Sequence, residues 1–230
     1  MIGIIGAMEI EVRLLKEHME IKQIITKAGM EFCEGDLNEK RVVVVRSGIG
    51  KVNAAVCAQI LIDDFNVKCL INTGIAGSLK EEINIGDVVI STDLVHHDID
   101  VSGLGYERGQ IPQMEVFSFQ ADKGLVALAA KVCEEVNPDI QVFQGRIVSG
   151  EQFVSEQSTK EAIVRRFSGY CTEMEGAAIG QTAYLNAVPF VVIRAISDKA
   201  NGGAPLDYAE FEAQAALHSI CLVEGMMERF

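Results

Sequence analysis

Residues 41–64 read RVVVVRSGIGKVNAAVCAQILIDD, and this stretch combines the two patterns from which the fold class follows. Its first part, Arg41 to Ser47, is a short apolar run of the kind that forms a buried strand. Glycines follow at 48 and 50, and Val52 to Asp64 has the length and spacing of a helix. A strand, a glycine turn and a helix in this order are typical of a sheet whose parallel strands are joined by crossover helices.

The same alternation continues toward both ends of the chain, so the sequence predicts an α/β fold with a mixed, mostly parallel central sheet flanked by helices. Further strands are predicted at residues 1–6, 67–73, 86–94, 141–149 and 188–196, with 31–37 pairing beside 41–47. Further helices are predicted at 9–19, 122–136, 158–166, 175–186 and 208–229. In the helix at 122–136, Asp122 is placed to cap the first turn, and an apolar stripe marks the buried face: Leu125, Leu128, Ala129, Val132 and Val136.

Length, composition and charge narrow the class of protein. The chain has 230 residues, 49% of them apolar, which suits a single domain over residues 1–230. Its net charge of −13 disfavours binding to nucleic acids and to anionic membranes, and no apolar run approaches the roughly 20 residues that cross a bilayer. Six cysteines without a CxxC pair, and an N-terminus without the basic lead-in of a secretory signal, lead us to expect a cytoplasmic protein.

Polar residues follow the predicted strands at four places: residues 6–11, 47–52, 72–77 and 194–198. Ligands of an open α/β sheet bind beyond the carboxyl ends of its strands, so these segments form the candidate site. Their glycine spacing is neither GxGxxG nor GxxxxGK[ST], which disfavours a dinucleotide or a triphosphate. Asp198 follows the last strand. Glu11 and Glu175 lie in the first turns of helices, where the helix dipole favours a carboxylate with or without a function.

The segment His96–Asp100 suggests a metal site, because alternate residues of a strand share one face and His96, Asp98 and Asp100 are suitable ligands. No further His or Cys has recognisable ligand spacing, so we expect no metal and favour a polar lining of the strand end. The chain also lacks a GxSxG elbow and any Cys or Ser with a nearby His, which disfavours covalent catalysis.

Five segments carry a family resemblance: GIIGAMEIEV at 3–12, SGIGKVNAA at 47–55, NTGIAG at 72–77, TEME at 172–175 and VVIRAISD at 191–198. In order and spacing they resemble bacterial 5'-methylthioadenosine/S-adenosylhomocysteine nucleosidases over nearly the whole chain. The resemblance implies a three-layer nucleoside phosphorylase-like fold, a homodimer, and no metal or organic cofactor. It implies hydrolysis of methylthioadenosine, S-adenosylhomocysteine and 5'-deoxyadenosine to adenine and a 5-substituted ribose, as in methionine salvage.

The resemblance also assigns roles to individual residues. Glu11 is expected to be the base that activates water, Asp198 the acid at adenine N7, and Glu175 the group that binds ribose and stabilises its positive charge. Arg194 is expected to help place the water. The other expected substrate contacts are Met174 at the ribose, Phe153 and Val154 at the adenine, Met8, Ile49, Val101 and Tyr208 around the 5'-thio group, and also Gly77 and Ser197.

Residues 103–114 contain Gly, Tyr and Pro with few apolar neighbours, and this composition predicts a long loop. The resemblance implies that Leu104, Tyr106 and Pro112 from this loop close the pocket across the dimer. Ile75 departs from the family, which often has a serine whose hydroxyl helps to hold the catalytic water. Water placement in this chain is therefore expected to depend on Glu11 and Arg194.

Cleavage of the bond between N9 and C1' leaves positive charge on the sugar and negative charge on the purine, so an acid and a base are both required. Asp198 must hold a proton near pH 7 while Glu11 must be ionised, so we expect environments that push their pKa values apart. Three alternatives stay open: a 6-amino-6-deoxyfutalosine hydrolase, a purine nucleoside phosphorylase, and a nucleoside-binding sensor. A phosphorylase needs a cationic phosphate site, but Arg46 and Arg194 are the only obvious strand-end arginines, which are too few, and Glu11 would repel phosphate.

Overall fold

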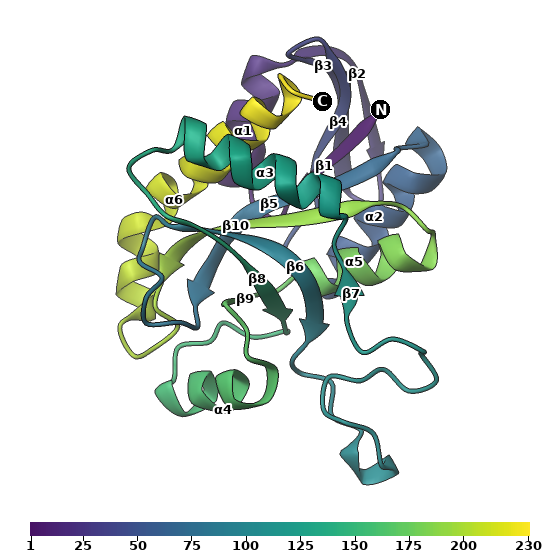
Figure 1. Cartoon of the computed structure of the whole chain (residues 1–230). Coiled ribbons are helices and arrows are strands. Elements are labelled where there is room, and N and C mark those ends of the chain that lie inside the picture. The colour runs from purple at the N-terminus through teal and green to yellow at the C-terminus, as the bar shows by residue number, and fades with distance from the viewer.

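The computed structural model describes residues 1–230, and its centre is one sheet of ten strands (Figure 1). The strands are β1 (Ile2–Gly6), β2 (Glu20–Lys27), β3 (Met30–Leu37), β4 (Lys40–Arg46), β5 (Cys69–Ser78), β6 (Val88–His96), β7 (Phe119–Gln120), β8 (Val142–Ser149), β9 (Cys171–Glu173) and β10 (Phe190–Asp198). The helices are α1 (Glu9–His18), α2 (Lys51–Phe65), the 3-10 turn η1 (Ser102–Leu104), α3 (Lys123–Val136), α4 (Gln157–Phe167), α5 (Gly176–Leu185) and α6 (Ala204–Met227).

Strand β5 is the junction of the sheet. On one side β1, β4, β3 and β2 follow it in that order, with parallel pairing as far as β4. On the other side β10, β6, β8 and β9 pair in turn, and β9 returns to β5, so that these five strands close a ring. The sheet is mixed, as predicted, but antiparallel pairings are as frequent as parallel ones.

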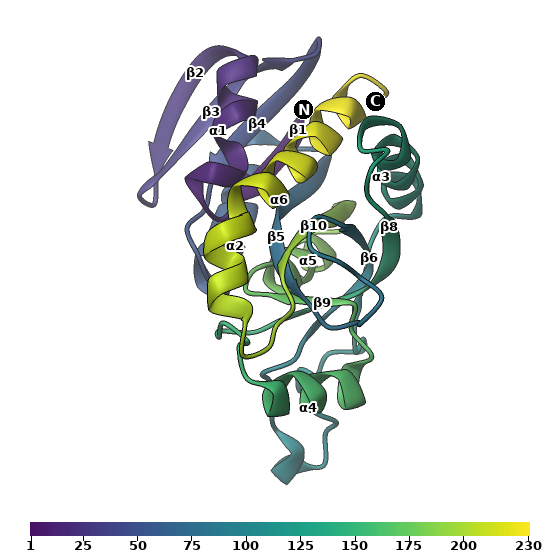
Figure 2. The ribbon, with the colours of Figure 1, turned by 90° about the vertical axis from the view of Figure 1, so that its left-hand side faces the viewer.

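Helices cover both faces of the sheet and give the three layers that the sequence predicts. On one face α6 packs against both α1 and α3, while α2 and α5 pack together on the other face (Figures 1 and 2). Helix α4 lies apart, below the ring of strands. No helix combines the length and the apolar character that crossing a membrane requires.

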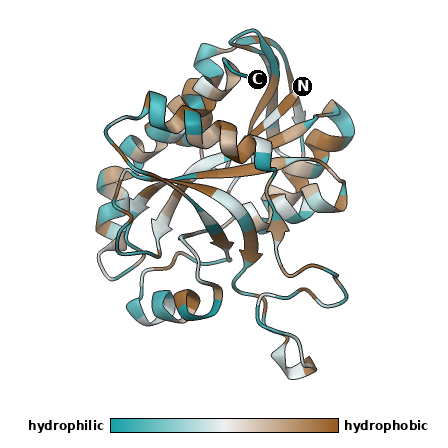
Figure 3. Cartoon of the chain, viewed as in Figure 1, coloured by the Kyte–Doolittle hydropathy of each residue, from teal (hydrophilic) through white to brown (hydrophobic).

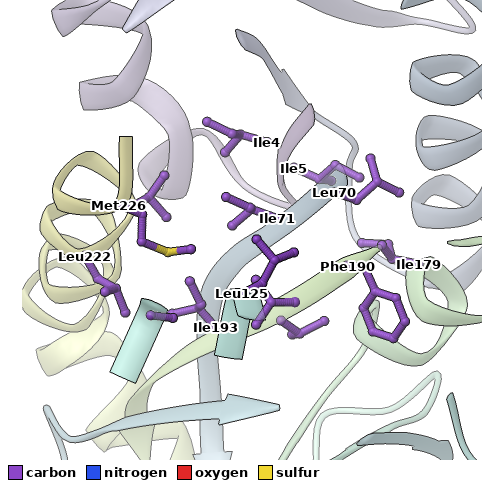
Figure 4. Close-up of a cluster of buried hydrophobic side chains, with 14 of the residues drawn as sticks. Ile4, Ile5, Leu70, Ile71, Leu125, Ile179, Phe190, Ile193, Leu222 and Met226 are labelled. Atoms are coloured by element: carbon purple, nitrogen blue, oxygen red, sulfur yellow. The ribbon is translucent and has the colours of Figure 1, made fainter. Parts of the chain in front are cut away.

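The core lies between the sheet and its two helical layers. Strands β1 and β10 are buried along their whole length, and Figure 3 shows hydrophobic residues along the central strands. Side chains from these strands meet Leu125 of α3, Ile179 of α5 and Leu222 of α6 (Figure 4). In α3 the predicted stripe faces this core, and the Asp122 carboxylate accepts a hydrogen bond from the Leu125 N–H at 2.9 Å, which confirms the predicted cap.

The structure departs from the predicted elements where a strand is short or exposed. Strand β2 was not predicted, because it is an edge strand with both faces largely exposed and no apolar alternation. Strands β7 and β9, of two and three residues, are too short to leave a periodic pattern. Strands β5 and β10 extend beyond their predicted ends to Ser78 and Asp198, so the polar segments expected just after these strands belong to them.

Candidate active site

A cavity of about 410 Å³ opens at the carboxyl ends of β1, β5 and β10. Eleven of the predicted site residues line it: Met8, Glu11, Ile49, Gly77, Phe153, Val154, Met174, Glu175, Ser197, Asp198 and Tyr208. The remaining lining residues are Ala7, Ile75, Ala76, Gln152, Thr172, Glu173 and Pro205. Four lining residues carry a carboxyl group and none carries a cationic side chain, so the cavity suits a neutral ligand that develops positive charge.

Glu11 is held by backbone donors at the start of α1. Its carboxylate accepts hydrogen bonds from the N–H groups of Ala7 at 2.7 Å, Met8 at 2.9 Å and Ile75 at 3.1 Å. A Cβ atom on Gly74 would lie 2.5 Å from the carboxylate oxygen Oε1, so this approach requires glycine. Burial raises the pKa of Glu11 and outweighs the opposing effects of Arg194 and the three donors. Glu11 is therefore positioned firmly and binds protons more strongly than an exposed glutamate.

Asp198 ends β10 with its carboxyl group almost fully buried. One oxygen accepts a hydrogen bond from the Ala200 N–H at 2.8 Å, and the other accepts one from the Ser197 hydroxyl at 2.9 Å. Burial raises the pKa of Asp198 despite these two donors. Burial thus raises the pKa values of both Asp198 and Glu11, so the two environments do not shift them in opposite directions.

Arg194 lies behind the cavity wall and not in the cavity, although it was expected beside the water. Its side chain is fully buried, and one terminal nitrogen donates to Glu173 at 2.5 Å and to Asn72 at 2.6 Å. Strand β10 continues four residues beyond Arg194, which places this arginine in the middle of the sheet. Arg194 therefore acts on the cavity through its neighbours and its charge.

Glu173 is a buried site residue to which the sequence reasoning assigned no role. Besides Arg194, its carboxylate accepts hydrogen bonds from the Ser149 hydroxyl and from the N–H groups of Glu175 and Gly176. Burial alone would raise the pKa of Glu173, but Arg194 and the other donors together hold it below its ordinary value. The position of Glu173 in the TEME segment was the only available signal, because its side-chain partners, Ser149 and Arg194, come from distant strands.

Glu175 projects from the N-terminus of α5 into the cavity. Its Oε1 atom accepts a hydrogen bond from the Gly50 N–H at 2.8 Å, and its Oε2 atom lies 4.0 Å from Arg194. Burial and the neighbouring charge of Glu173 raise the pKa of Glu175. A ligand that carries positive charge would relieve this destabilisation of the ionised carboxylate.

The opposite half of the lining is apolar. The rings of Phe153 and Tyr208 meet edge to face with centroids 5.7 Å apart, and the Tyr208 hydroxyl donates to the Met8 sulfur at 3.2 Å. Ile49 and Phe153 are each about half exposed and form the mouth. The cavity therefore combines a polar floor with an apolar rim.

A clamp formed by Lys51, Asp98 and Glu151 joins three segments around the cavity. The Lys51 ammonium group contacts both carboxylate oxygens of Asp98, at 2.7 and 2.8 Å, and the Glu151 N–H donates to Asp98 at 2.9 Å. Glu151 in turn accepts a hydrogen bond from the Lys51 N–H at 2.7 Å, in the first turn of α2. The clamp thereby connects the start of α2, which follows Ile49, to the segment that carries Phe153.

Comparison with known proteins identifies the family. The model of the phosphorylase superfamily matches residues 1–224. The 5'-methylthioadenosine/S-adenosylhomocysteine nucleosidase of Bacillus thuringiensis subsp. konkukian is 44% identical over 228 residues, which are 99% of this chain and 98% of that protein. The chain belongs to this nucleosidase family of the phosphorylase superfamily.

Solved structures of the nucleosidase family share the whole fold. The enzyme of Neisseria meningitidis in complex with methylthio-immucillin-A superposes with a TM-score of 0.95 at 40% identity, over 100% of this chain and 99% of that chain. A futalosine hydrolase of Helicobacter pylori has a TM-score of 0.94 at 32% identity, over 100% of this chain and 97% of that chain. The fold is therefore common to proteins named for two different substrates.

Four residues that the family resemblance assigned to the pocket lie outside the cavity. Val101 is not a lining residue, and neither are Leu104, Tyr106 and Pro112 from the predicted loop. Apart from the short η1, the chain between β6 and β7 has no regular structure, and Figure 1 shows it extending away from the sheet. The side chain of Leu104 is 75% exposed. Within one chain, this loop does not complete the pocket.

The three residues that were weighed as metal ligands, His96, Asp98 and Asp100, do not converge. Strand β6 ends at His96, so the expectation that all three share one strand face is wrong. His96 contacts Gln181 at 3.0 Å, Asp98 belongs to the clamp, and Asp100 pairs with Arg108 at 2.5 Å. The structure contains no group of three or more His, Cys, Asp or Glu side chains arranged to hold a metal ion.

Proposed function

We propose that this chain hydrolyses the N-glycosidic bond of 5'-methylthioadenosine and S-adenosylhomocysteine, and also of 5'-deoxyadenosine. The products are adenine and the 5-substituted ribose. The observation that carries the proposal is a single cavity that holds Glu11, Glu175 and Asp198 without any cationic side chain. Such a cavity can give a proton to the departing adenine, accept a proton from the attacking water and place negative charge beside the oxocarbenium-like sugar.

Asp198 is the proposed general acid at adenine N7. Its raised pKa favours a protonated carboxyl group, and a proton given to N7 lets adenine leave as a neutral molecule. The Ser197 hydroxyl, 2.9 Å from Asp198, stabilises the carboxylate that remains after the transfer. Phe153 and Val154 are the proposed contacts of the adenine ring, and Gly77 leaves room beside Asp198, because a Cβ atom there would lie 2.7 Å from its oxygen.

Glu11 is the proposed general base for water. A raised pKa makes the ionised carboxylate a stronger base, and three N–H donors keep it in one orientation. Arg194 contributes its positive charge from behind the wall, which favours the ionised form of Glu11. Isoleucine at position 75 offers no hydroxyl to the water, and its backbone N–H, which a serine would also have, is bonded to Glu11.

Glu175 and Met174 are the proposed ribose contacts. Glu175 loses its bound proton most readily when positive charge appears nearby, so its interaction strengthens as the oxocarbenium ion forms. Met8, Ile49 and Tyr208 form the apolar side that receives the 5'-thio group. Discrimination by such packing is modest, about 1–3 kcal/mol per methylene, which suits several 5' substituents.

Two reaction alternatives make different demands on the cavity. A purine nucleoside phosphorylase would have to hold phosphate, but Arg194 is neutralised by Glu173 behind the wall and Arg46 does not line the cavity. A sensor that binds without turnover has no need for buried acid and base groups with raised pKa values. A 6-amino-6-deoxyfutalosine hydrolase would place the same demands on the cavity, so this substrate belongs in the test panel.

The deciding experiment is incubation with methylthioadenosine in phosphate-free buffer, with chromatographic detection of adenine. We expect adenine without phosphate and no acceleration when phosphate is added. Turnover only after phosphate addition would establish a phosphorylase, and binding by calorimetry without adenine release would establish a sensor. If the protein prefers 6-amino-6-deoxyfutalosine in the same panel, the proposed hydrolysis of the N-glycosidic bond stands but the proposed substrate is wrong.

The proposal extends to assembly and location. A homodimer is proposed in which Leu104, Tyr106 and Pro112 reach the neighbouring cavity, since the loop that carries them extends away from its own subunit. All six cysteines are free thiols, five of them buried, which agrees with a reducing cytoplasm. The catalytic groups proposed above are all side chains of the chain itself, and the reaction draws on no cofactor.

A further inference from the structure

A second hollow of about 380 Å³ adjoins the active-site cavity. Three of its lining residues, Ala7, Met8 and Ile49, also line the cavity, so the two spaces meet at the apolar rim. The others are Glu9, Gly29, Arg46, Ser47 and Gly48. Under the proposed function, the 5' substituent of the nucleoside points toward this rim, and the hollow is the space that adjoins the rim in this chain.

The parallel ends of β1 and β4 build the floor of this hollow. Gly6 and Arg46 are paired in register, and the chain continues the pairing with hydrogen bonds from the Ser47 N–H to Gly6 at 2.9 Å and from the Gly48 N–H to Ala7 at 3.1 Å. The last residue of β4 and the first residue of α1 therefore stand beside each other. These residues are Arg46 and Glu9.

Arg46 and Glu9 provide one charge of each sign. Their closest atoms, Nε of Arg46 and Oε2 of Glu9, are 3.7 Å apart, and both side chains are about half exposed. The two terminal nitrogens of Arg46 donate no hydrogen bond within the chain, whereas Glu9 is held by Lys16 at 3.2 Å. The hollow thus has an oriented carboxylate and a guanidinium group with free paired donors.

We propose that this hollow binds the amino-acid end of S-adenosylhomocysteine, with Arg46 on its carboxylate and Glu9 on its ammonium group. The paired donors of a guanidinium group match the two oxygens of a carboxylate, which a single ammonium group does not. Methylthioadenosine has no such end and leaves the hollow unused. This inference depends on the proposed function, and it assigns Arg46 and Glu9 to selection among 5' substituents, apart from the chemistry at N9 and C1'.

The test compares three substrates that differ only beyond the sulfur: methylthioadenosine, the uncharged 5'-butylthioadenosine, and S-adenosylhomocysteine. For Arg46→Ala we expect kcat/KM for S-adenosylhomocysteine to fall about fivefold to tenfold, the range for a partly exposed ion pair with paired hydrogen bonds. Values for the other two substrates should stay within about twofold. Arg46→Lys should restore part of the loss. The matched control is Arg41→Ala, an exposed arginine of β4 that pairs with Glu34 outside the hollow.

The outcomes separate this inference from the function on which it rests. An equal loss for all three substrates with Arg46→Ala, or no loss for any, would overturn the binding site. A loss shared by S-adenosylhomocysteine and 5'-butylthioadenosine would show that length and not charge is recognised, and would also overturn it. If the unmodified protein releases adenine from none of the three, the proposed function itself has failed.

Discussion

Asp198 and Glu11 are buried carboxyl groups with raised pKa values, and the proposed mechanism gives them opposite tasks. Asp198→Asn removes the proton donor and Glu11→Gln removes the base, so each should lower kcat for methylthioadenosine by at least about 10²-fold. Adenine release measured under single-turnover conditions checks this. Glu17→Gln, on the exposed side of α1, is the control. Near-normal turnover in either variant would remove that residue from its role.

Glu175 gives a prediction about stability and pH. Its pKa is raised from the ordinary value of 4.5, so the folded protein binds this proton more tightly than the unfolded chain does. The free energy of unfolding due to Glu175 is therefore greatest at low pH and falls as the pH rises toward the raised pKa. Glu175→Gln has no proton to lose, so between about pH 5 and pH 8 the unmodified protein should lose stability relative to this variant. Urea unfolding followed by circular dichroism measures the free energy of unfolding of both proteins at each pH. A difference between them that does not change with pH would contradict the prediction.

Ile75 offers a test of how the water is held. Its N–H is bonded to Glu11, and its side chain is almost fully buried at the cavity wall. Ile75→Ser should lower the free energy of unfolding by about 1–3 kcal/mol, because a buried side chain is truncated. The new hydroxyl should raise kcat by roughly threefold to tenfold as an added hydrogen-bonding group for water. Ile75→Val, which truncates without adding a hydroxyl, should leave kcat unchanged. An equal kcat for both variants would argue against this role.

At the scale of elements, the start of α2 depends on groups from distant segments. Gly50 cannot cap the helix with a side chain, and Glu175 and Glu151 accept the N–H groups of Gly50 and Lys51 in its place. Both carboxylates also benefit from the helix dipole. The cavity wall at Ile49 and the segment at Phe153 are therefore held together through one helix terminus.

Asp98→Ala should loosen this connection. We expect a loss of about 1–2 kcal/mol in the free energy of unfolding, because Lys51 and the Glu151 N–H lose a charged partner at a partly exposed position. KM for methylthioadenosine should rise about tenfold, with a smaller change in kcat, because the wall that positions the substrate shifts. Steady-state kinetics and thermal unfolding check both effects. Asp63→Asn, near the other end of α2, is the control. A lower free energy of unfolding for Asp98→Ala without a change in KM would show that the clamp stabilises the fold but does not position the substrate.

The sequence predicted well those helices and strands whose own residues carry an apolar run, an apolar stripe or a capping residue. Strands β1 and β4 contain continuous apolar runs, and α3 has both a capping residue and an apolar stripe, so the positions of these elements follow from their own residues. Strand β2 was missed because it is stabilised only by pairing with β3, and that pairing leaves no mark in its own residues. The ends of β5 and β10 were placed too early for a similar reason, since polar residues inside the ring of strands resemble residues of a loop.

At the scale of the whole molecule, the exposed loop between β6 and β7 is the proposed contact between the two subunits of a homodimer. Leu104 is a large apolar side chain with 75% of its surface exposed, and the loop carries it away from the sheet. Leu104→Asp should shift the proposed homodimer toward monomer in sedimentation equilibrium and raise KM for methylthioadenosine. A monomeric unmodified protein with normal KM would contradict the assembly. Leu206→Asp, an equally exposed leucine at the start of α6, is the control for a nonspecific effect of the charge.

The sequence by itself determined the fold class, the carboxyl groups after β1 and at the end of β10, and the family, because each depends on local periodicity or on the order of short motifs. Only the tertiary structure decided that Arg194 lies behind the cavity, that Glu173 holds it there, and that the pKa of Glu11 is raised with that of Asp198. It also placed Arg46 beside Glu9. These facts depend on burial and on contacts between residues far apart in the chain. Desolvation and Coulomb interactions are properties of distance in space, which neighbouring residues in a sequence do not encode.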